Sequence, residues 1–481
     1  MNFAIVRFIL GCVLEFEAAF LLLPAIVGVI YGEIRSALAF LATASLCLVF
    51  GLLMRWKRPA QKDIYTREGF ASVALSWLVL SIFGAVPFVI TGEIPHFVDA
   101  LFETASGFTT TGASILTNVE ALSHASLFWR SFTHWIGGMG VFVFIMAILP
   151  LIGGGTTMNL MRAESPGPSV GKLVPRVKDT AKILYQLYIG ITVIGAIVLC
   201  VCGLNLFESL TTIFGTVGTG GFGIYNDSVM SFTPLVQNMI TVFMILSGIN
   251  YTVYFCLLRR QFKAALSIEE VRWYLCIILG SVALIVWNIH KLYPTLSETI
   301  RHAFFQVASI ITTTGFSSAD FDVWPQLSKT ILVILMFVGA CAGSTGGGIK
   351  VSRILILLKT IRKELTMMIH PRMVKKIKMD GRTLSQEVLR ATNVFIAVYS
   401  VILFASVLAI GLDNFDFTTN FTAVAATLNN IGPGLELVGP TQNYFIFSSF
   451  SKCVLIFDML AGRLELFPML IILMPSCWKK Y

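Results

Sequence analysis

Long apolar segments alternate with short polar segments along the chain. The hydrocarbon core of a membrane requires about 20 mostly apolar residues per crossing helix. The segments that meet this requirement are 3–30, 36–54, 69–91, 132–153, 181–204, 232–258, 273–289, 330–358, 392–411 and 444–475. The eighth of them is interrupted by a glycine-rich stretch. The pattern therefore predicts an all-α integral membrane protein, and the even number of spans places both termini on one side.

Composition supports the same class. Of the 481 residues, 56% are hydrophobic and 13% are charged, whereas soluble domains carry about 25% charged residues. These figures exclude a disordered chain, a fibrous protein and a secreted disulfide scaffold.

The positive charges predict the orientation. Most of the 35 Lys and Arg residues fall in loops on one predicted side, chiefly 55–67, 162–182, 259–272 and 350–390. Because positively charged loops stay in the cytoplasm, both termini are expected there. This bias also accounts for the net charge of +9, so no nucleic-acid partner is expected.

Four outer loops contain related motifs. They read LFETASGFTTTGAS (101–114), TTIFGTVGTGGFGIYN (211–226), FFQVASIITTTGFSS (304–318) and AVAATLNNIGPG (423–434). Aligned on one glycine, they give an internal repeat of roughly 105 residues. Each repeat has a span, a short segment, a glycine-centred stretch and a second span. The predicted units are an N-terminal helix pair (1–66) and four repeats (67–176, 177–268, 269–388 and 389–481).

These stretches predict an ion filter. Non-helical backbone at membrane depth occurs only where it is buried or lines a water-filled cavity, and its carbonyls can then replace the hydration shell of an ion. Glycine permits the necessary backbone angles, and threonine adds a hydroxyl acceptor. Surface turns are the alternative, which four copies in register disfavour. The candidate ion-binding residues are Thr110, Thr111, Gly112, Thr219, Gly220, Gly221, Thr313, Thr314, Gly315, Asn430, Ile431 and Gly432.

Five segments match the motifs of a known family, namely FTTTGAS, ITTTGFSSADF, LNNIGPG, CAGSTGGGIKVSR and MLAGRLELF. Through them the chain resembles the Trk/Ktr/HKT potassium-transporter superfamily over essentially its whole length, and TrkH-type bacterial subunits most of all. TrkH-like members carry an extra N-terminal helix pair, which 3–54 would supply. The resemblance implies potassium uptake through a pseudo-fourfold pore in the bacterial cytoplasmic membrane. It also implies a homodimer, a TrkA-like cytoplasmic nucleotide-binding ring as regulatory partner, and no covalently bound cofactor.

Selectivity follows from the same resemblance. Family members with glycine in all four loops favour potassium, whereas some plant relatives with serine in the first loop favour sodium. The four glycines here therefore imply potassium. Thr219-Gly220-Gly221 and Asn430-Ile431-Gly432 depart from Thr-Thr-Gly. Such an unequal ring indicates looser selectivity, and rubidium is expected to permeate.

The interrupted eighth span predicts an unwound segment. Three consecutive glycines, 346–348, would cost a helix about 3 kcal/mol. The resemblance implies an intramembrane gating loop beneath the filter. Close helix packing through small residues is one alternative. A nucleotide-binding loop is disfavoured because Ile349 separates Gly348 from Lys350. The candidate gating residues are Gly343, Ser344, Thr345, Gly346, Gly347, Gly348, Lys350 and Arg463.

Arg463 is a charge within the tenth apolar segment, where charges are costly and usually functional. Partners on one helix lie three or four residues apart, whereas Asp458 is five away and Glu465 two. The sequence therefore predicts a partner on another segment, or pore water. The resemblance places this arginine below the filter, against the gating loop, and a structural ion pair is the alternative.

Two other function classes compete with a passive pathway. A secondary transporter coupled to protons or sodium would have inverted repeats, whereas these four repeats share one polarity. An enzyme would require a convergent nucleophile, base or metal cluster, and the sequence offers none. The run from Lys359 to Arg390 is expected to contact anionic lipid or to dock the regulatory ring.

Overall fold

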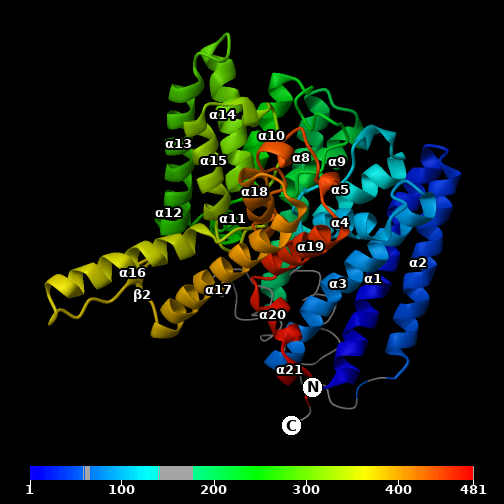
Figure 1. The fold of residues 1–481 in the computed structure, drawn as a ribbon, viewed down its shortest axis with the longest axis horizontal. Coiled ribbons are helices and arrows are strands. Elements are labelled where there is room, and N and C mark those ends of the chain that lie inside the picture. The colour runs from blue at the N-terminus through cyan, green and yellow to red at the C-terminus, as the bar shows by residue number, and fades with distance from the viewer. Residues whose placement is uncertain (58, 60–64, 139, 141–176, 480–481) are drawn as a thin grey trace.

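The computed structural model describes residues 1–57, 59, 65–138, 140 and 177–479. Long helices surround a centre of short helices and irregular backbone (Figure 1). The helices are α1 (Phe3–Ile30), α2 (Ile34–Arg55), α3 (Thr66–Thr91), α4 (Phe97–Phe108), α5 (His124–Gly138), α8 (Val177–Val201), α9 (Leu206–Val217), α10 (Pro234–Ser247), α11 (Tyr251–Leu258), α12 (Phe262–Ser267), α13 (Glu269–Ile289), α14 (Leu296–Ile311), α15 (Gln326–Val338), α16 (Val351–Ile369), α17 (Gln386–Ile410), α18 (Phe417–Leu428), α19 (Ser449–Arg463), α20 (Phe467–Leu473) and α21 (Pro475–Trp478).

A helix pair and four repeats make up this fold, as the sequence predicts. After α1 and α2, the order of a long helix, a short helix and a further helix occurs as α3–α4–α5, α8–α9–α10, α13–α14–α15 and α17–α18–α19. Among the described residues, six helices are long and apolar enough to cross a membrane, namely α1, α2, α3, α8, α13 and α17. The residue boundaries proposed for the repeats stay a prediction. Most of the predicted fourth span, 132–153, lies outside the described residues.

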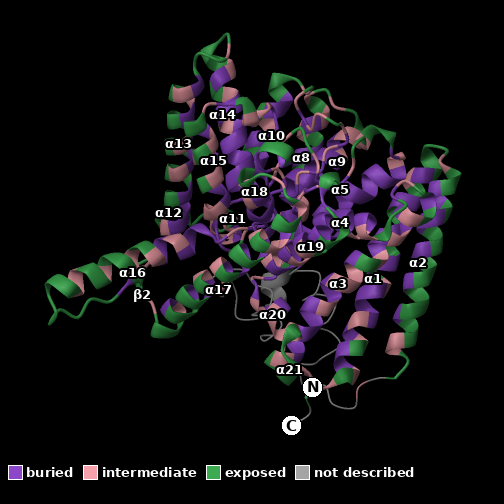
Figure 2. Ribbon diagram, in the orientation of Figure 1, coloured by how far each residue is buried: buried purple, intermediate pink, exposed green. Residues whose placement is uncertain are grey.

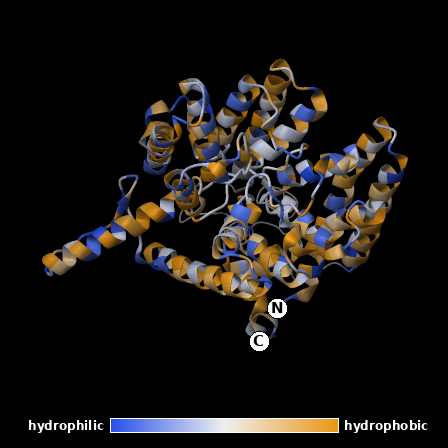
Figure 3. Cartoon of the chain, turned by 45° about the horizontal axis from the view of Figure 1, so that its top comes forward, coloured by the Kyte–Doolittle hydropathy of each residue, from blue (hydrophilic) through white to orange (hydrophobic). Residues whose placement is uncertain are grey.

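Both ends of the chain lie at the same end of the molecule (Figure 1), where the Met1 nitrogen is 3.5 Å from the Lys479 carbonyl oxygen. The exterior of the molecule is more apolar than that of a soluble protein. Hydrophobic residues cover the outer helices (Figure 3), and the residues around the centre are buried (Figure 2). Many of the buried residues are threonines and serines, including those of the four glycine-centred stretches. This distribution suits a protein whose outer surface faces lipid, because exposed apolar side chains cost no free energy there.

The predicted sixth span, 232–258, is wrong as a single helix. Helices α10 and α11 within it meet at an angle of 91°. At the break, the Asn250 side chain accepts the Thr252 amide at 2.8 Å and begins a new helix. A methyl group added at Gly248 would lie 2.5 Å from the Tyr274 hydroxyl, so the close packing at this corner requires glycine.

The predicted tenth span, 444–475, is also broken. Helix α19 ends at Arg463, and the chain turns at Glu465 and Leu466, whose φ angles are 57° and 67°. Pro468 then lies in the first turn of α20, where a missing amide proton costs nothing. Arg463 therefore lies at the end of a helix and not in the middle of a span.

The eighth span is interrupted as predicted, between α15 and α16. Helix α16 projects from the bundle and is followed by a hairpin of two short strands, β1 (Lys378–Met379) and β2 (Arg382–Thr383) (Figure 1). The register pairs Lys378 with Thr383 and Met379 with Arg382. The connecting Asp380-Gly381 has φ angles of 50° and 76°, as a two-residue hairpin turn requires.

Candidate functional site

Four short helices, α4, α9, α14 and α18, point their carboxyl ends at the glycine-centred stretches. They end at Phe108, Val217, Ile311 and Leu428, one residue before Thr109, Gly218, Thr312 and Asn429. The carboxyl end of a helix carries a partial negative charge. Four such ends around one centre favour a cation there.

All four stretches adopt the same backbone turn. The residue two before each aligned glycine has a positive φ: 55° at Thr110, 53° at Thr219, 58° at Thr313 and 56° at Asn430. The glycines follow with φ angles of 80° at Gly112, 81° at Gly221, 83° at Gly315 and 97° at Gly432. The intervening amides bond back into the helix, from Thr111 to Ser106 (2.9 Å), Gly220 to Gly215, Thr314 to Ser309 and Ile431 to Ala426 (2.8 Å each). This is a helix-ending motif with a six-to-one hydrogen bond, repeated four times.

Three of these turns hold a threonine in the left-handed region, which is unusual for a β-branched residue. Such backbone costs of the order of 1–3 kcal/mol and persists only where the surroundings impose it. Neighbouring hydroxyls support it in the first and third stretches, where Thr109 bonds to Thr111 at 2.7 Å and Thr312 to Thr314 at 2.8 Å. The strain is therefore built into the stretches themselves.

The four stretches form a closed ring. The order of contacts follows from the atoms nearest to a methyl group added at each glycine. At Gly112 it would lie 2.0 Å from the Gly220 carbonyl oxygen, at Gly221 2.0 Å from that of Thr314, at Gly315 2.0 Å from that of Ile431, and at Gly432 2.8 Å from that of Thr111. Each glycine thus abuts the residue before the next glycine, and the fourth returns to the first. Glycine is required for this close approach as well as for its φ. The contact between the fourth and first stretches is the loosest.

Different side chains support the four stretches. In the fourth, the Asn430 side-chain amide donates to the Thr111 hydroxyl at 3.0 Å and to the Met459 carbonyl at 2.8 Å. Between the first and second, the buried His134 ring lies 2.8 Å from the Gly107 carbonyl oxygen through Nδ1 and accepts the Phe222 amide at 3.1 Å through Nε2. Since Nε2 accepts, Nδ1 carries the proton. Sequence reasoning missed this role of His134, because it depends on contacts with residues far away in the chain.

A buried ion pair holds the chain that follows the first two stretches. Glu103 on α4 lies 2.8 Å from Arg130 on α5, and both side chains are almost fully buried. Glu103 also accepts the Ser114 hydroxyl and the Ile115 amide, each at 3.0 Å. Arg130 donates to the Gly223 carbonyl at 3.1 Å. Glu103 is therefore a buried hydrogen-bonding group, and the role of Arg130 is one that sequence reasoning missed.

The glycine-rich segment between α15 and α16 passes directly against the third and fourth stretches. The Gly347 amide donates to the Thr313 hydroxyl at 2.6 Å. Methyl groups added at Gly346 and Gly347 would lie 2.9 Å from the Thr312 carbonyl oxygen and 2.5 Å from that of Asn429. The small residues therefore serve close packing of an unwound segment against the ring.

Arg463 finds its partners on other segments, as predicted. Its guanidinium donates to the Thr345 carbonyl at 2.8 Å and to the Gly137 carbonyl at the end of α5 at 2.7 Å. Lys350 is buried, has a φ of 81°, and donates from its ammonium group to the Gly346 carbonyl. The structure thus brings Arg463 and Lys350 to the glycine-rich segment, where the buried Arg353 also donates to the Ile349 carbonyl at 3.3 Å.

Several further contacts fix this segment, and some of them involve residues that the sequence did not single out, Glu270 above all. The Glu270 carboxylate at the start of α13 accepts the Ala342 amide at 2.7 Å and the Ser352 amide at 3.0 Å, one on each side of the segment. The Gly343 carbonyl, at a residue with a φ of 73°, accepts the Tyr251 amide at 3.1 Å. Ser344 donates to the Cys341 carbonyl at 2.7 Å. The remaining gating candidate, Gly348, has a φ of 74° and packs against Gly339.

The arrangement suits a weakly hydrated monovalent cation. Four carboxyl helix ends and a ring of backbone carbonyls offer neutral oxygen ligands and partial negative charge. In the described part of the chain, no group of three or more His, Cys, Asp or Glu residues could hold a metal ion. Apolar outer helices, four re-entrant segments and a central carbonyl ring together define a multi-pass membrane protein of the pore-forming cation-transport class.

Comparison with known proteins identifies the family. The family described as "TrkH: Cation transport protein" matches residues 36–480. The Trk system potassium uptake protein TrkH of Escherichia coli (strain K12) is 38% identical over 489 residues, and the match covers 100% of both chains. TrkG of the same organism is 33% identical over 466 residues, which cover 95% of this chain and 94% of TrkG. The crystal structure of the potassium transporter TrkH from Vibrio parahaemolyticus superposes with a TM-score of 0.89 at 33% identity and covers 100% of both chains. The chain belongs to the TrkH family of cation transport proteins, which confirms the resemblance predicted from its motifs.

Proposed function

We propose that this protein takes up potassium, and rubidium with it, across the bacterial cytoplasmic membrane through the carbonyl ring of its four glycine-centred stretches. The observation that carries the proposal is the closed order of contacts in which each glycine meets the carbonyl preceding the next glycine. A ring of this kind can replace the hydration shell of an ion. Relatives that match the whole chain are named as potassium uptake proteins.

The ligands in this proposal are mainly backbone carbonyls of the ring residues. Thr111 and Thr314 already use their hydroxyls in hydrogen bonds to Thr109 and Thr312, which favours the backbone carbonyls as the groups that face an ion. The membrane potential supplies about 2.3 kcal/mol per elementary charge at 100 mV, which corresponds to roughly fiftyfold accumulation. Uptake then requires no coupled ion and no chemical step, and the protein acts as a transporter and not as an enzyme.

The glycine-rich segment is the gate in this proposal, with Arg463 as its latch. Gly346 and Gly347 pack against the third and fourth stretches. This contact supports a segment that obstructs the ion path while it stays in place. The Arg463 guanidinium holds the Thr345 carbonyl of the segment and adds a positive charge on the cytoplasmic side of the ring. A cation there is repelled until the segment moves away.

The protein functions as a homodimer with a TrkA-like cytoplasmic nucleotide-binding ring, and both of its termini are cytoplasmic. The name "Trk system", carried by the relatives, supports a multi-component assembly. Helix α16 supports contact with a second copy, because it projects from the bundle (Figure 1) with exposed apolar residues, including Leu365 at 56% and Met368 at 77% exposure. The basic residues from Lys359 to Arg390 suit a cytoplasmic partner or anionic lipid.

Rubidium uptake into potassium-loaded liposomes tests this function. Vesicles that contain the purified chain, with pH and sodium equal on both sides, are compared with protein-free vesicles given valinomycin. Uptake competed strongly by potassium and weakly by sodium supports the proposal. Uptake that requires a proton or sodium gradient assigns a coupled transporter instead. If neither the wild type nor Arg463→Ala takes up rubidium, while the valinomycin vesicles do, a potassium pathway is contradicted.

A further inference from the structure

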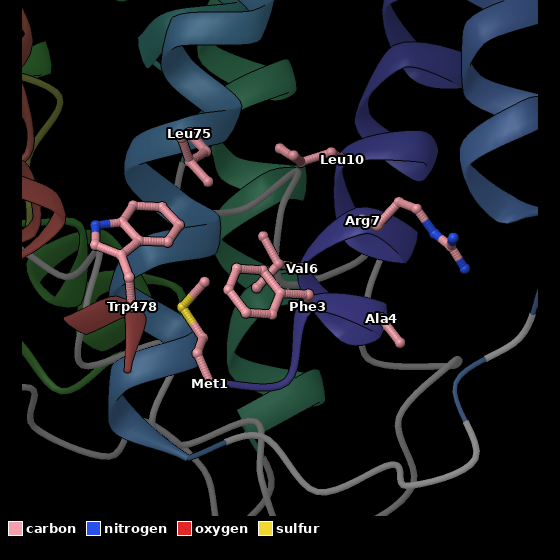
Figure 4. Close-up of a pocket in the computed structure, with 8 residues that line it drawn as sticks. All are labelled: Met1, Phe3, Ala4, Val6, Arg7, Leu10, Leu75 and Trp478. Atoms are coloured by element: carbon pink, nitrogen blue, oxygen red, sulfur yellow. The ribbon is translucent and has the colours of Figure 1, made fainter. Parts of the chain in front are cut away.

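A groove of about 400 Å³ opens between the N-terminal end of α1, the first half of α3 and α21 (Figure 4). Its lining is almost entirely apolar and includes Phe3, Ala4, Leu10, Leu75 and Trp478. Figure 4 shows these side chains around one hollow, at the end of the molecule that carries both termini. The groove lies on the exterior of the helix bundle, and none of its lining residues belongs to the carbonyl ring.

Two aromatic rings form one wall of this groove. Phe3 and Trp478 are stacked with their centroids 6.3 Å apart and an interplanar angle of 21°. Phe3 is nevertheless 49% exposed, so the protein itself leaves the groove open. Tryptophan is enriched at the level of the lipid headgroups, where its ring is partly apolar and partly polar. A wall of this composition suits the boundary between acyl chains and headgroups.

The rim of the groove is basic. Arg7 is directed away from the apolar side chains (Figure 4) and donates to the Lys57 carbonyl at 3.1 Å. Arg67, in the first turn of α3, donates to the Lys479 carbonyl at 3.1 Å, next to the groove residue Trp478 in sequence. Within the described part of the chain, Arg7 forms no ion pair, whereas the nearby carboxylate of Glu68 is buried and lies 3.6 Å from Arg67. The rim thus presents positive charge beside an apolar hollow.

We propose that this groove binds an anionic phospholipid, with one acyl chain against Phe3, Leu75 and Trp478 and the headgroup phosphate at Arg7. Apolar lining and basic rim match the two halves of such a lipid, and a long arginine side chain reaches the headgroup level while its stem stays in apolar surroundings. A zwitterionic lipid offers the same acyl chain without net negative charge, so the rim discriminates against it. The site is independent of the proposed ion pathway.

The headgroup part is tested by native mass spectrometry of the full chain with phosphatidylglycerol and phosphatidylcholine of identical acyl chains. We expect preferential retention of phosphatidylglycerol. Arg7→Gln should lower the affinity ratio of the two lipids about fivefold, since one basic residue near the surface contributes about 1 kcal/mol. Arg35→Gln, at the opposite end of the N-terminal helix pair, is the matched control and should leave the ratio unchanged. Equal affinities, or an Arg7→Gln ratio equal to that of wild type, overturn the proposal.

The acyl part is tested by tryptophan quenching with phosphatidylglycerol brominated on its acyl chains. Because the chain has 8 tryptophans, the difference between wild type and Trp478→Phe isolates the signal of Trp478. We expect this signal to be quenched, and Ala4→Phe, which fills the groove, to reduce the quenching at least about threefold. Ala42→Phe on the exposed face of α2 is the control. Quenching absent in the wild type, or unaffected by Ala4→Phe, overturns the site.

Discussion

Replacing Gly315 by alanine tests the ring most directly. The added methyl group would lie 2.0 Å from the Ile431 carbonyl oxygen, whereas such carbon atoms essentially never approach closer than 3.0 Å. One of the two stretches must then move by at least about 1 Å, several times the roughly 0.2 Å within which ion–ligand distances are held in well-formed sites. We expect the potassium/sodium permeability ratio to fall at least about tenfold, equal to about 1.4 kcal/mol.

A matched control separates this steric effect from backbone strain. Gly32, in the loop between α1 and α2, has a φ of 73° and nothing within 4 Å of an added methyl group. Gly32→Ala carries the same free-energy cost of a left-handed backbone, about 1–2 kcal/mol, without displacing a carbonyl group. It should lower thermal stability and leave selectivity unchanged. Gly432→Ala, with a contact of 2.8 Å, should have an intermediate effect.

The assay for these variants is rubidium and sodium uptake into liposomes, with the melting temperature of each purified protein as a check on folding. A folded Gly315→Ala protein with the wild-type permeability ratio would refute the carbonyl ring as the filter. An equal loss in Gly32→Ala would attribute the change to general destabilisation.

Three further predictions concern the supports of the ring. Arg463→Ala removes the hydrogen bonds to the Thr345 and Gly137 carbonyls and should raise rubidium uptake several-fold. Unchanged uptake in both Arg463→Ala and Arg463→Lys would argue against Arg463 as a latch. Glu103→Gln leaves Arg130 buried without its ion-pair partner and should cost about 3–5 kcal/mol of unfolding free energy. Its control is Glu364→Gln at an exposed ion pair with Lys363, which should change the unfolding free energy by no more than about 0.5 kcal/mol. Similar melting temperatures of the two variants would contradict the argument. Asp416 caps α18, and its hydrogen bonds with Thr419 lower the pKa of its carboxyl group. The stability that the charged carboxylate contributes is therefore full above the ordinary pKa of about 3.9. It is lost as the pH falls through the lowered pKa. Asp416→Asn keeps a capping oxygen and should flatten this acid-dependent part of the melting profile, which is checked by thermal unfolding between pH 5 and pH 3.

The apolar lengths and the glycine pattern were enough to predict most of the architecture. A membrane span is a local property of about 20 residues, so helices such as α1 and α13 could be located from composition alone. Four aligned glycines each require a positive φ, and that requirement is also local. The interruption before α16 was predictable because consecutive glycines disfavour a helix regardless of their neighbours.

Other features depend on contacts between residues far apart in the chain. Glu103 with Arg130, and His134 between the first and second stretches, lie beside the ring only because α4 and α5 pack together. Nothing in the spacing of these residues distinguishes them from ordinary buried polar groups. Their positions could be read only from the assembled fold.

By itself, the sequence determined how many repeats there are, where the backbone must leave the helix at four glycines, and which span is unwound. The tertiary structure alone decided the 91° bend between α10 and α11, because one glycine in an apolar helix costs only about 1 kcal/mol and does not by itself break it. At that bend the Gly248 carbonyl accepts the Cys341 amide, and the Tyr251 amide donates to the Gly343 carbonyl, each at 3.1 Å. Hydrogen bonds to another segment thus replace those that the helix gives up, and such long-range partners are not encoded in local sequence.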